Sequence, residues 1–405
     1  MIKFYYLSGF LILFAIFSAQ AQVITREDSL NAGLTPPVAG QNTVISGYGQ
    51  GQYSRNFKTN TAEANLPRIV TFFGHRFNRN ISFFSELEIE DVKVEGGSPG
   101  GEVAMEQAFL KFNLNRDMYV VTGLFLPRIG IINENHLPTT FNGNERTQVE
   151  TILIPSTWRE LGVGLYGTSR RMAGLNYNIA LVNGLNSQGF GSEKMGIREG
   201  RWEGRNAVAN NLAVTGALLY FVGNFRIQTS AYYGGSLAVK TPLTDSLSLK
   251  GGSFGTPVLL NEANIQYRSN GLTVKALAAH ININDASKII GAYSDSASLE
   301  EHNIGKSMVG AYIEVGYNIF NLGSWKEKLA NKHLILFSRY ETLDLTYKAA
   351  VNGFRDPSLN QQHWVSGITY MPTRGVVLKA DYRYSVNKVA NSGTGILNLG
   401  FGYSF

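Results

Sequence analysis

The sequence predicts an all-β protein: a transmembrane antiparallel β-barrel of about 16 strands, with long extracellular loops and short periplasmic turns. Three observations lead to this fold class. Many segments of about ten residues alternate between apolar and polar residues, and turn residues separate them. Charged residues make up only 16% of the 405 residues, yet the mean hydropathy of −0.08 stays near zero. After the N-terminal segment there is no run of about 18 apolar residues, which excludes a helical membrane protein.

The last segment shows the alternation most clearly. From Leu397 to Phe405 every odd-numbered residue is large and apolar or aromatic, whereas every even-numbered residue is small or polar. One face of such a strand suits lipid and the other suits water. The terminal Phe405 resembles the C-terminal targeting signal that the barrel assembly machinery recognises in bacterial outer-membrane barrels. The alternative is the edge strand of a soluble sheet.

The same reasoning gives an even number of strands along the chain, which returns both ends of the barrel to the periplasm. Short turns carry the Asn, Gly and Pro that tight turns need, as at Asn78-Arg79 and Asn270-Gly271. A short helical turn is expected at 320–331. The expected strands are 43–55, 66–77, 80–91, 103–114, 117–129, 159–168, 171–184, 207–221, 224–235, 259–269, 271–283, 306–319, 332–345, 361–371, 374–386 and 393–405. The expected long loops are 56–65, 92–102, 130–158, 185–206, 236–258, 284–305, 346–360 and 387–392.

The N-terminus predicts an export signal. Lys3 precedes an apolar stretch at 5–17, and Ala19-Gln20-Ala21 has the small-x-small pattern of a cleavage site. A membrane anchor is the alternative, although the stretch is short against the roughly 20 residues of a span. We therefore expect a cleaved signal peptide (1–21), a short periplasmic tail (22–42) and a multi-pass barrel (43–405) in the bacterial outer membrane.

A barrel of this size encloses an aqueous channel unless something narrows it. The tail at 22–42 is too short to be a folded plug. The longest loop, 130–158, is therefore the candidate constriction loop. The inner face of every strand is expected to be polar.

One stretch has a recognisable pattern: QAFLKFNLNRDMYVVTGLFLPRIGI is followed by PSTWRELGVGLYG within residues 107–167. It resembles the phosphate-selective porin O and P family, and the resemblance extends over most of the mature chain. The resemblance implies a barrel of about 16 strands, usually trimeric, with basic residues along an anion path. Gln107, Leu124 and Leu126 depart from the family pattern, so phosphate specificity is not carried over. The matching residues are Ala108, Gly123, Pro127, Arg159, Gly162, Val163, Leu165 and Gly167, with further matches at 183–184, 310–314, 339–340 and 367–372.

Charged residues that alternation places on inner faces, or that lie at the constriction loop, are the candidate pore-lining residues. Acidic residues are expected on the same faces, so the wall alone gives little ion selectivity. Arg383 could instead belong to a structural charge network with Lys379 and Asp381. The basic candidates are Arg128, Arg146, Arg159, Lys111, Arg226, Lys275, Arg339, Lys379 and Arg383. The acidic residues are Glu86, Glu88, Glu160, Glu314, Glu341 and Asp381.

Arg198, Arg201 and Arg205 form a candidate extracellular basic cluster in loop 185–206, where a helical segment would place them on one face. Such a cluster would raise the local concentration of anions. The alternatives are contact with lipopolysaccharide, or pairing with nearby glutamates at 193, 199 and 203.

Other kinds of site find no support in the sequence. There is no cysteine, and the six histidines have no metal-ligand spacing, so we expect no metal and no cofactor. No nucleophile-elbow motif points to a catalytic residue, and the interleaved charges do not suggest nucleic acid. The glycine-rich stretch 47–51 opens no helix, and we interpret it as an inward-facing small surface of the first strand.

The resulting hypothesis is a homotrimeric outer-membrane porin for the passive diffusion of small hydrophilic solutes, with a possible preference for anions such as phosphate. Two alternatives stay open: a barrel transporter for hydrophobic compounds, and a structural or adhesive barrel without an open pore. Conductance would separate the porin from the structural barrel, and hydrocarbon uptake would test the transporter.

Overall fold

The computed structural model describes most of the chain from residue 42 onwards. The predicted signal peptide (1–21) and nearly all of the predicted tail (22–42) lie outside the described residues. The described ranges are 42–91, 101–191, 196–204, 206–207, 209, 211–235, 257–293, 303–323, 325–329, 331–389 and 393–405.

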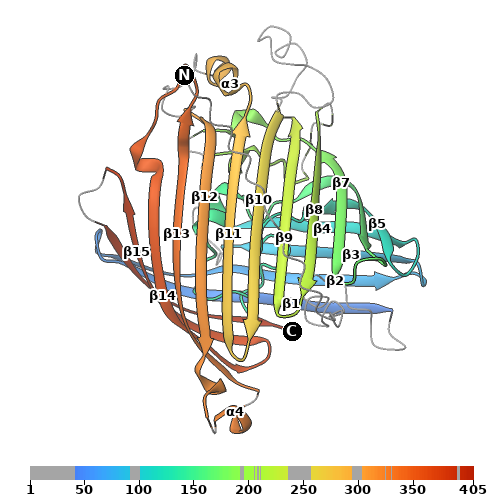
Figure 1. Cartoon of the computed structure of the whole chain (residues 1–405), viewed down its shortest axis with the longest axis vertical. Coiled ribbons are helices and arrows are strands. Elements are labelled where there is room, and N and C mark those ends of the chain that lie inside the picture. Colours follow the sequence, from blue (N-terminus) through green and yellow to red (C-terminus); the bar gives the residue numbers. More distant parts are fainter. Residues whose placement is uncertain are drawn as a thin grey trace, which may run out of the picture.

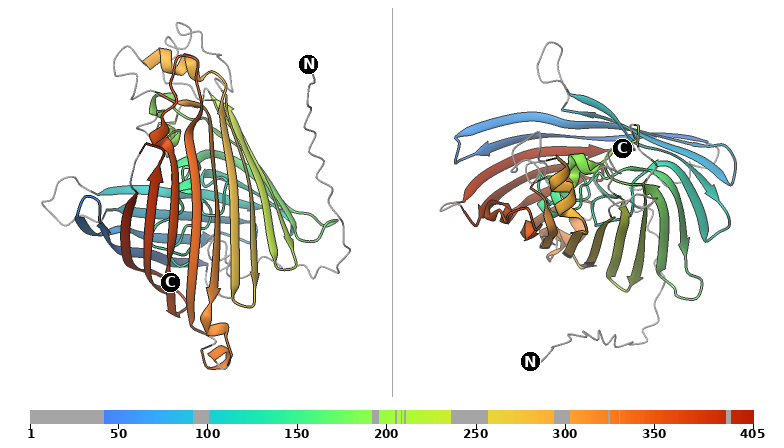
Figure 2. Two further views of the ribbon diagram at one scale, coloured as in Figure 1. Left: turned by 60° about the vertical axis from the view of Figure 1, so that its left-hand side comes forward. Right: turned by 90° about the horizontal axis from the view of Figure 1, so that it is seen from above.

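Sixteen antiparallel strands form one closed barrel (Figure 1), in which each strand pairs with its neighbours in sequence and β1 pairs with β16. The wall encloses the loops that fold inside it, as the view from above shows (Figure 2). The predicted fold class and strand number are confirmed. The strands are β1 (Thr43–Asn56), β2 (Thr61–Arg76), β3 (Ile81–Glu90), β4 (Glu102–Asn113), β5 (Met118–Phe125), β6 (Glu160–Thr168), β7 (Leu175–Asn183), β8 (Leu212–Val222), β9 (Phe225–Gly235), β10 (Pro257–Ser269), β11 (Leu272–Ile283), β12 (Gly305–Asn318), β13 (His333–Ala349), β14 (Asn360–Thr373), β15 (Val376–Asn387) and β16 (Thr394–Ser404).

Helices occur only in the connections among the described residues. Helix α3 (Ala286–Tyr293) follows β11 at the end of the barrel that carries the long loops, and α4 (Trp325–Lys328) follows β12 at the opposite end (Figure 1). Helix α4 occupies the position of the helical turn expected at 320–331. No helix in the described part of the chain has the length and apolar character needed to cross a membrane.

One predicted loop is wrong. Residues 56–65 were expected to form a long loop, but β2 already begins at Thr61 and only four residues separate it from β1. The side chain of Asn56 accepts hydrogen bonds from the backbone N–H groups of Lys58 and Thr59, and Asn60 adopts a left-handed φ of 56°. Asn favours such turns because its side chain can bond to the local backbone. The first residues of β2 are all exposed, and their alternation rests mainly on the small Ala62 and Ala64, which gives a weak strand signal.

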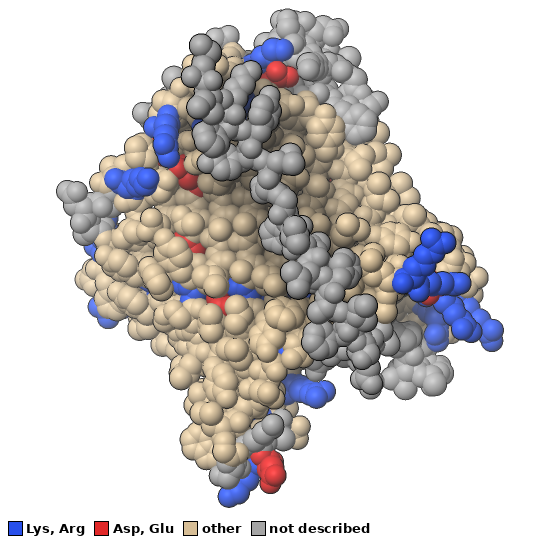
Figure 3. Space-filling view, viewed as in Figure 1, with Lys and Arg blue, Asp and Glu red and all other residues tan. Residues whose placement is uncertain are grey.

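The outer face of the barrel is apolar, as expected for a surface that meets lipid. Val163, Ile179, Leu218, Ile313 and Leu378 are exposed on it although they are large and apolar. In the space-filling view (Figure 3) most of this surface is neither basic nor acidic, and most visible Lys and Arg lie toward its edges. Many charged side chains of the strands, such as Glu314, Arg339 and Lys379, are instead buried inside the barrel.

The glycines of β1 correct a second expectation, because they face outward rather than inward. A Cβ atom at Gly49 would lie 2.6 Å from the Tyr403 hydroxyl oxygen, and one at Gly51 would lie 2.6 Å from the Phe401 ring. Both rings belong to β16, which pairs directly with β1. The glycines leave room for aromatic rings that cover the join between the first and last strands, as aromatic residues do for glycines in other sheets.

The connection between β5 and β6 folds into the barrel. We call residues 126–159 the inner loop; it includes the predicted constriction loop 130–158 and a short helical turn at Val149–Leu153. It is longer than predicted because β5 ends at Phe125 rather than at 129.

Candidate functional site

The inner loop is bound to strands on several sides of the barrel. On one side, His136 Nε2 lies 2.8 Å from the Tyr48 hydroxyl oxygen on β1. Close by, the Asn144 backbone N–H donates to Asp381 on β15 at 2.7 Å, and the Thr139 hydroxyl lies 3.2 Å from that of Ser404 on β16. On the opposite side of the barrel, the Gln228 side-chain amide on β9 donates to the Gly130 carbonyl oxygen at 2.9 Å. A segment with partners this far apart along the wall crosses the interior of the barrel.

Several wall anchors are carboxylates that accept hydrogen bonds from the loop. Their partners are backbone N–H groups or side-chain amides, which need acceptors because they are buried. Acidic residues that alternation places inside the barrel are thus used to hold the loop. The pairs are Gly130 N to Glu262 Oε2 at 3.3 Å, Asn142 Nδ2 to Glu314 Oε1 at 3.0 Å, Val149 N to Glu341 Oε2 at 3.2 Å and Asn144 Nδ2 to Asp381 Oδ2 at 2.7 Å.

Glu150 is a carboxylate that the loop itself contributes to the contacts between loop and wall. The backbone N–H groups of Ile131 and Ile132 donate to its Oε1 at 2.5 and 2.7 Å, and the Tyr312 hydroxyl on β12 donates to its Oε2 at 2.6 Å. Burial raises the pKa of the Glu150 carboxyl to about 7, because these hydrogen bonds only partly offset the loss of water. Glu150 therefore ties the loop to itself and to the wall.

His136 sits in a second buried cluster, facing β3 and β4. Its Nε2 atom lies 3.4 Å from Glu106 Oε2 and 3.8 Å from Glu86 Oε1. Burial alone would lower the pKa of His136, but the two carboxylates outweigh it and raise that pKa to about 9. The Tyr48 hydroxyl also donates to Glu106 Oε2 at 3.0 Å.

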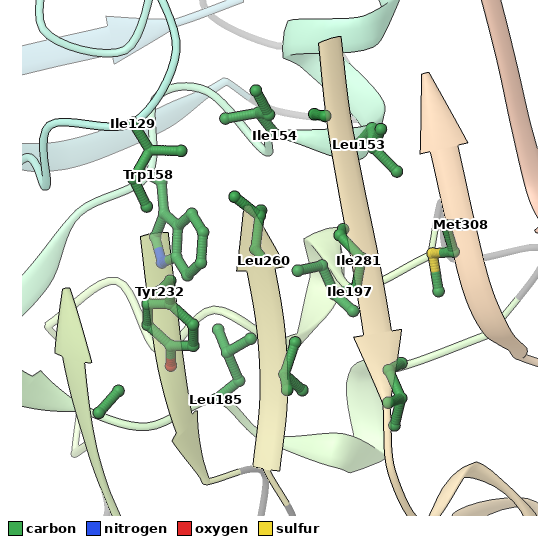
Figure 4. Packing of buried hydrophobic residues seen from close by; sticks show 14 of the residues in the cluster. Ile129, Leu153, Ile154, Trp158, Leu185, Ile197, Tyr232, Leu260, Ile281 and Met308 are labelled. Atoms are coloured by element: carbon green, nitrogen blue, oxygen red, sulfur yellow. The ribbon is translucent and has the colours of Figure 1, made fainter. Parts of the chain in front are cut away.

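Part of the interior is apolar, which corrects the expectation of a polar inner face throughout. Figure 4 shows side chains from the inner loop and from the inner faces of β9 to β12 pointing toward one another. Trp158 packs on Tyr232 with ring centroids 4.7 Å apart, and Leu260 and Ile281 are fully buried beside them. The loop thus buries apolar surface against this side of the wall, and that burial stabilises its position.

The nine predicted basic pore-lining residues all have partners. Several are neutralised: Arg339 bonds Glu341 at 2.7 Å and Glu314 at 3.2 Å, and Lys275 lies 3.6 Å from Glu314. Lys111 and Lys379 instead sit over aromatic rings. The remaining contacts are Arg128 to Glu134 at 2.6 Å, Arg159 to Glu203 at 3.0 Å, Arg383 to Glu145, Arg146 to the His136 carbonyl at 3.5 Å, Lys379 over Phe141 at 3.9 Å, Lys111 over Tyr119 at 4.1 Å and Arg226 over Phe221 at 5.9 Å.

Arg198 and Arg201 of the predicted basic cluster are turned toward the inner loop. Arg198 donates to the Thr151 and Ser156 carbonyls at 2.6 and 2.9 Å. Arg201 donates to the Pro155 and Thr157 carbonyls at 3.1 and 3.2 Å, and it also pairs with Glu203 at 2.9 Å. Arg198 begins a single 3-10 turn rather than a helix, and Arg205 lies outside the described residues. The two described arginines therefore fasten one loop to another.

The sequence analysis missed Glu106, Glu150, Glu262 and His136. A β-bulge explains the first, because the β3–β4 register shifts between Glu86 and Leu87. The shift turns the Glu106 side chain inward. Glu106 directly precedes Gln107, which occupies the position where the family pattern has an acidic residue. His136 and Glu150 lie in an irregular loop, where no periodicity shows which way a side chain points.

Comparisons with known proteins agree with this fold. A protein of Aquifex aeolicus, described as uncharacterized, is 31% identical over 344 residues, which cover 84% of this chain and 74% of the relative. No family model matches the chain.

Three solved outer-membrane structures share the fold. OmpF of Salmonella typhi is 13% identical with a TM-score of 0.57, over 90% of this chain and 98% of that one. The outer membrane channel DcaP of Acinetobacter baumannii is 12% identical with a TM-score of 0.54, over 90% and 97%. An anion-selective porin from Comamonas acidovorans is 10% identical with a TM-score of 0.53, over 90% and 99%. At this level of identity the likeness concerns the fold. The chain belongs to the same family as the Aquifex aeolicus protein, and it has the 16-stranded barrel fold of outer-membrane porins.

Proposed function

We propose that this protein is an outer-membrane porin, a passive channel for small hydrophilic solutes that the inner loop narrows. The observation that carries the proposal is the attachment of the inner loop to opposite sides of a closed 16-stranded barrel, at Tyr48 on β1 and at Gln228 on β9. A barrel of this size leaves an aqueous passage where side chains do not fill it. The similar folds of DcaP and OmpF support the same role.

A weak preference for anions is the finer part of the proposal. Most of the predicted basic side chains inside the barrel form ion pairs with carboxylates. Lys111, Arg146 and Lys379 form no ion pair with a described carboxylate. Lys379 also lines a small pocket together with Gln50 and Asn144. Uncancelled positive charge at the wall favours the passage of anions. The resemblance to phosphate-selective porins is the reason to include phosphate among the anions tested.

Single-channel recording of the refolded protein in a planar bilayer tests the proposal. We expect stable conductance steps, in triplets if the protein is a homotrimer, and a reversal potential shifted toward that of chloride in a KCl gradient. Lys379→Gln should move the reversal potential toward zero, whereas Lys306→Gln, an exposed lysine on β12, should not. A folded barrel without conductance would contradict the porin proposal.

The apolar packing inside the barrel favours a second candidate, a transporter of hydrophobic compounds. Leu260, Ile281 and Trp158 form part of an interior apolar surface of the kind such a transporter needs. Liposomes that contain the protein would then take up a long-chain hydrocarbon faster than empty liposomes, with little ion conductance.

A further inference from the structure

We propose that Glu86, Glu106 and His136 form a binding site for a divalent transition-metal cation, with Zn²⁺ as the representative ion. The three side chains come from β3, β4 and the inner loop, and each is at most 5% exposed. One potential ligand atom of each lies within 4.8 Å of the other two. A bound cation would therefore join the inner loop to two wall strands.

The spacing of these atoms fits a zinc site. In tetrahedral zinc sites the bonds to His nitrogen and carboxylate oxygen are about 2.0–2.2 Å, so neighbouring ligand atoms lie roughly 3.3–3.6 Å apart. Here His136 Nε2 lies 3.4 Å from Glu106 Oε2 and 3.8 Å from Glu86 Oε1. One imidazole and two carboxylates suit zinc or another first-row divalent metal better than Ca²⁺ or Mg²⁺, which prefer oxygen ligands.

The second and independent observation is that each ligand is held by its other polar atom. His136 Nδ1 lies 3.0 Å from the Asn133 carbonyl oxygen, which leaves Nε2 facing the carboxylates. Thr157 donates to Glu106 Oε1 at 2.8 Å, and Gln107 donates to Glu86 Oε2 at 2.6 Å. The three remaining atoms, which would bind the metal, converge. Metal-ligating residues are oriented in this way by outer hydrogen bonds.

The local charge also calls for a cation. Glu88 is fully buried next to the cluster, and neither of its carboxylate oxygens accepts a hydrogen bond from a described residue. In the metal-free protein Arg68, with Nη1 3.3 Å from Glu88 Oε1, and a protonated His136 supply positive charge against the carboxylates of Glu86, Glu88 and Glu106. A divalent cation would displace the proton from His136 Nε2 and supply positive charge in its place. Tyr48, whose hydroxyl lies close to both Glu106 and His136, could supply the fourth contact.

Zinc binding by the folded protein tests this site without any measurement of conductance, so its outcome is independent of the porin proposal. The refolded full-length protein, without an affinity tag, is treated with chelator in detergent, dialysed and titrated with ZnCl₂ by calorimetry. We expect one zinc ion per chain. His136→Gln and Glu106→Gln should weaken binding at least tenfold, while Thr157→Val should weaken it about tenfold through Glu106.

His363→Gln is the matched control, because His363 is also buried and faces inward but contacts Ser385 instead. It should bind zinc like the unmodified protein. Heat-modifiable migration on gels shows that each variant is folded, and Glu86→Gln replaces any variant that is not. The absence of stoichiometric binding by the folded protein would overturn the proposal, and so would equal binding by His136→Gln and His363→Gln.

Discussion

The hydroxyl of Tyr312 on β12 donates a 2.6 Å hydrogen bond to Oε2 of Glu150 in the inner loop. Both side chains are buried, and the two residues are 162 positions apart in the sequence. The bond joins the loop to the wall at the helical turn near its C-terminal end. Since a buried acceptor that loses its donor costs about 1–3 kcal/mol, this contact helps to decide where the loop sits.

Tyr312→Phe should therefore loosen the inner loop without unfolding the barrel. The substitution removes only the hydrogen-bond donor and keeps the ring. We therefore expect the free energy that holds the loop against the wall to fall by about 1–3 kcal/mol. The open-channel current should become noisier, and protease should cleave the loop faster. Tyr340→Phe is the control, because Tyr340 on β13 packs on Trp364, which lies on the exposed face. Equal current noise in the two variants would contradict a role for the Tyr312 hydroxyl.

The seating of the loop should weaken as the pH rises from 5 to 8. The pKa of Glu150 is about 7 in the folded protein against an ordinary value of 4.5. Between these two pH values the Glu150 carboxyl group is therefore protonated when the loop is bound to the wall and ionised when the loop is released. Its stabilising effect is complete below pH 4.5 and is lost as the pH rises through 7. The ratio of seated to released loop should fall on the order of a hundredfold.

Glu150→Gln removes this pH dependence. A glutamine can still accept from the two backbone N–H groups and can donate to Tyr312, so it resembles the protonated carboxyl group. Protease protection of the loop measured at pH 5 and pH 8 should differ in the unmodified protein and be equal in the variant. A variant that keeps the full pH dependence would show that another group is responsible.

Arg339→Met should destabilise the barrel strongly. Arg339 joins the buried carboxylates of Glu314 and Glu341, and its loss would leave Glu341 without a counter-ion and Glu314 with Lys275 alone. Breaking one side of a buried ion pair costs about 3–5 kcal/mol. We expect a lower melting temperature and a smaller heat-modifiable fraction after refolding. Arg268→Met, at an exposed site on β10, should change neither.

A double variant separates charge from packing at Arg339. Adding Glu341→Gln to Arg339→Met removes the carboxylate that is left without a counter-ion, so it should recover part of the lost stability. If the double variant is no more stable than Arg339→Met alone, the loss comes from packing rather than from unpaired charge.

Gly49→Val should impair the closure of the barrel. The new side chain would start 2.6 Å from the Tyr403 hydroxyl oxygen, so the ring that covers the join between β1 and β16 would have to move. Overpacking of this kind costs about 1–3 kcal/mol. Refolding yield, measured as the heat-modifiable fraction, should drop for Gly49→Val. Ala278→Val, at an exposed position on β11, should leave the yield unchanged.

The sequence predicted the wall far better than the interior. Strand β16 alternates strictly because one face meets lipid and the other does not, so its bounds came out within two residues. Strand β2 was shortened in the prediction because its first residues are exposed on both sides and alternate only with small alanines, which is a weak signal. The outward glycines were misassigned because a glycine has no side chain to reveal its face; only the aromatic rings of β16 show it.

The candidate site depends on the path of the inner loop, which no periodicity predicts. Lys275 and Arg339 were placed inside correctly by alternation, but their carboxylate partners could not be chosen from the sequence. His136 comes close to Glu86 and Glu106 only because the loop crosses the barrel and a bulge turns Glu106 inward. For Arg198 the sequence left three roles open: attraction of anions, contact with lipopolysaccharide and pairing with glutamates. It could not show the contact with loop carbonyl groups, because those groups come close only in the fold.

The far reach of the inner loop has a consequence for the order of assembly. The loop precedes β6 in the sequence, yet it touches β13, β15 and β16, and its Thr139 contacts Ser404 across 265 residues. Contacts between such distant residues form late, because the chain between them must first be arranged. The loop can make its last bonds only after the final strand is in place. During refolding, the time at which the loop becomes resistant to protease would therefore report when the barrel is complete.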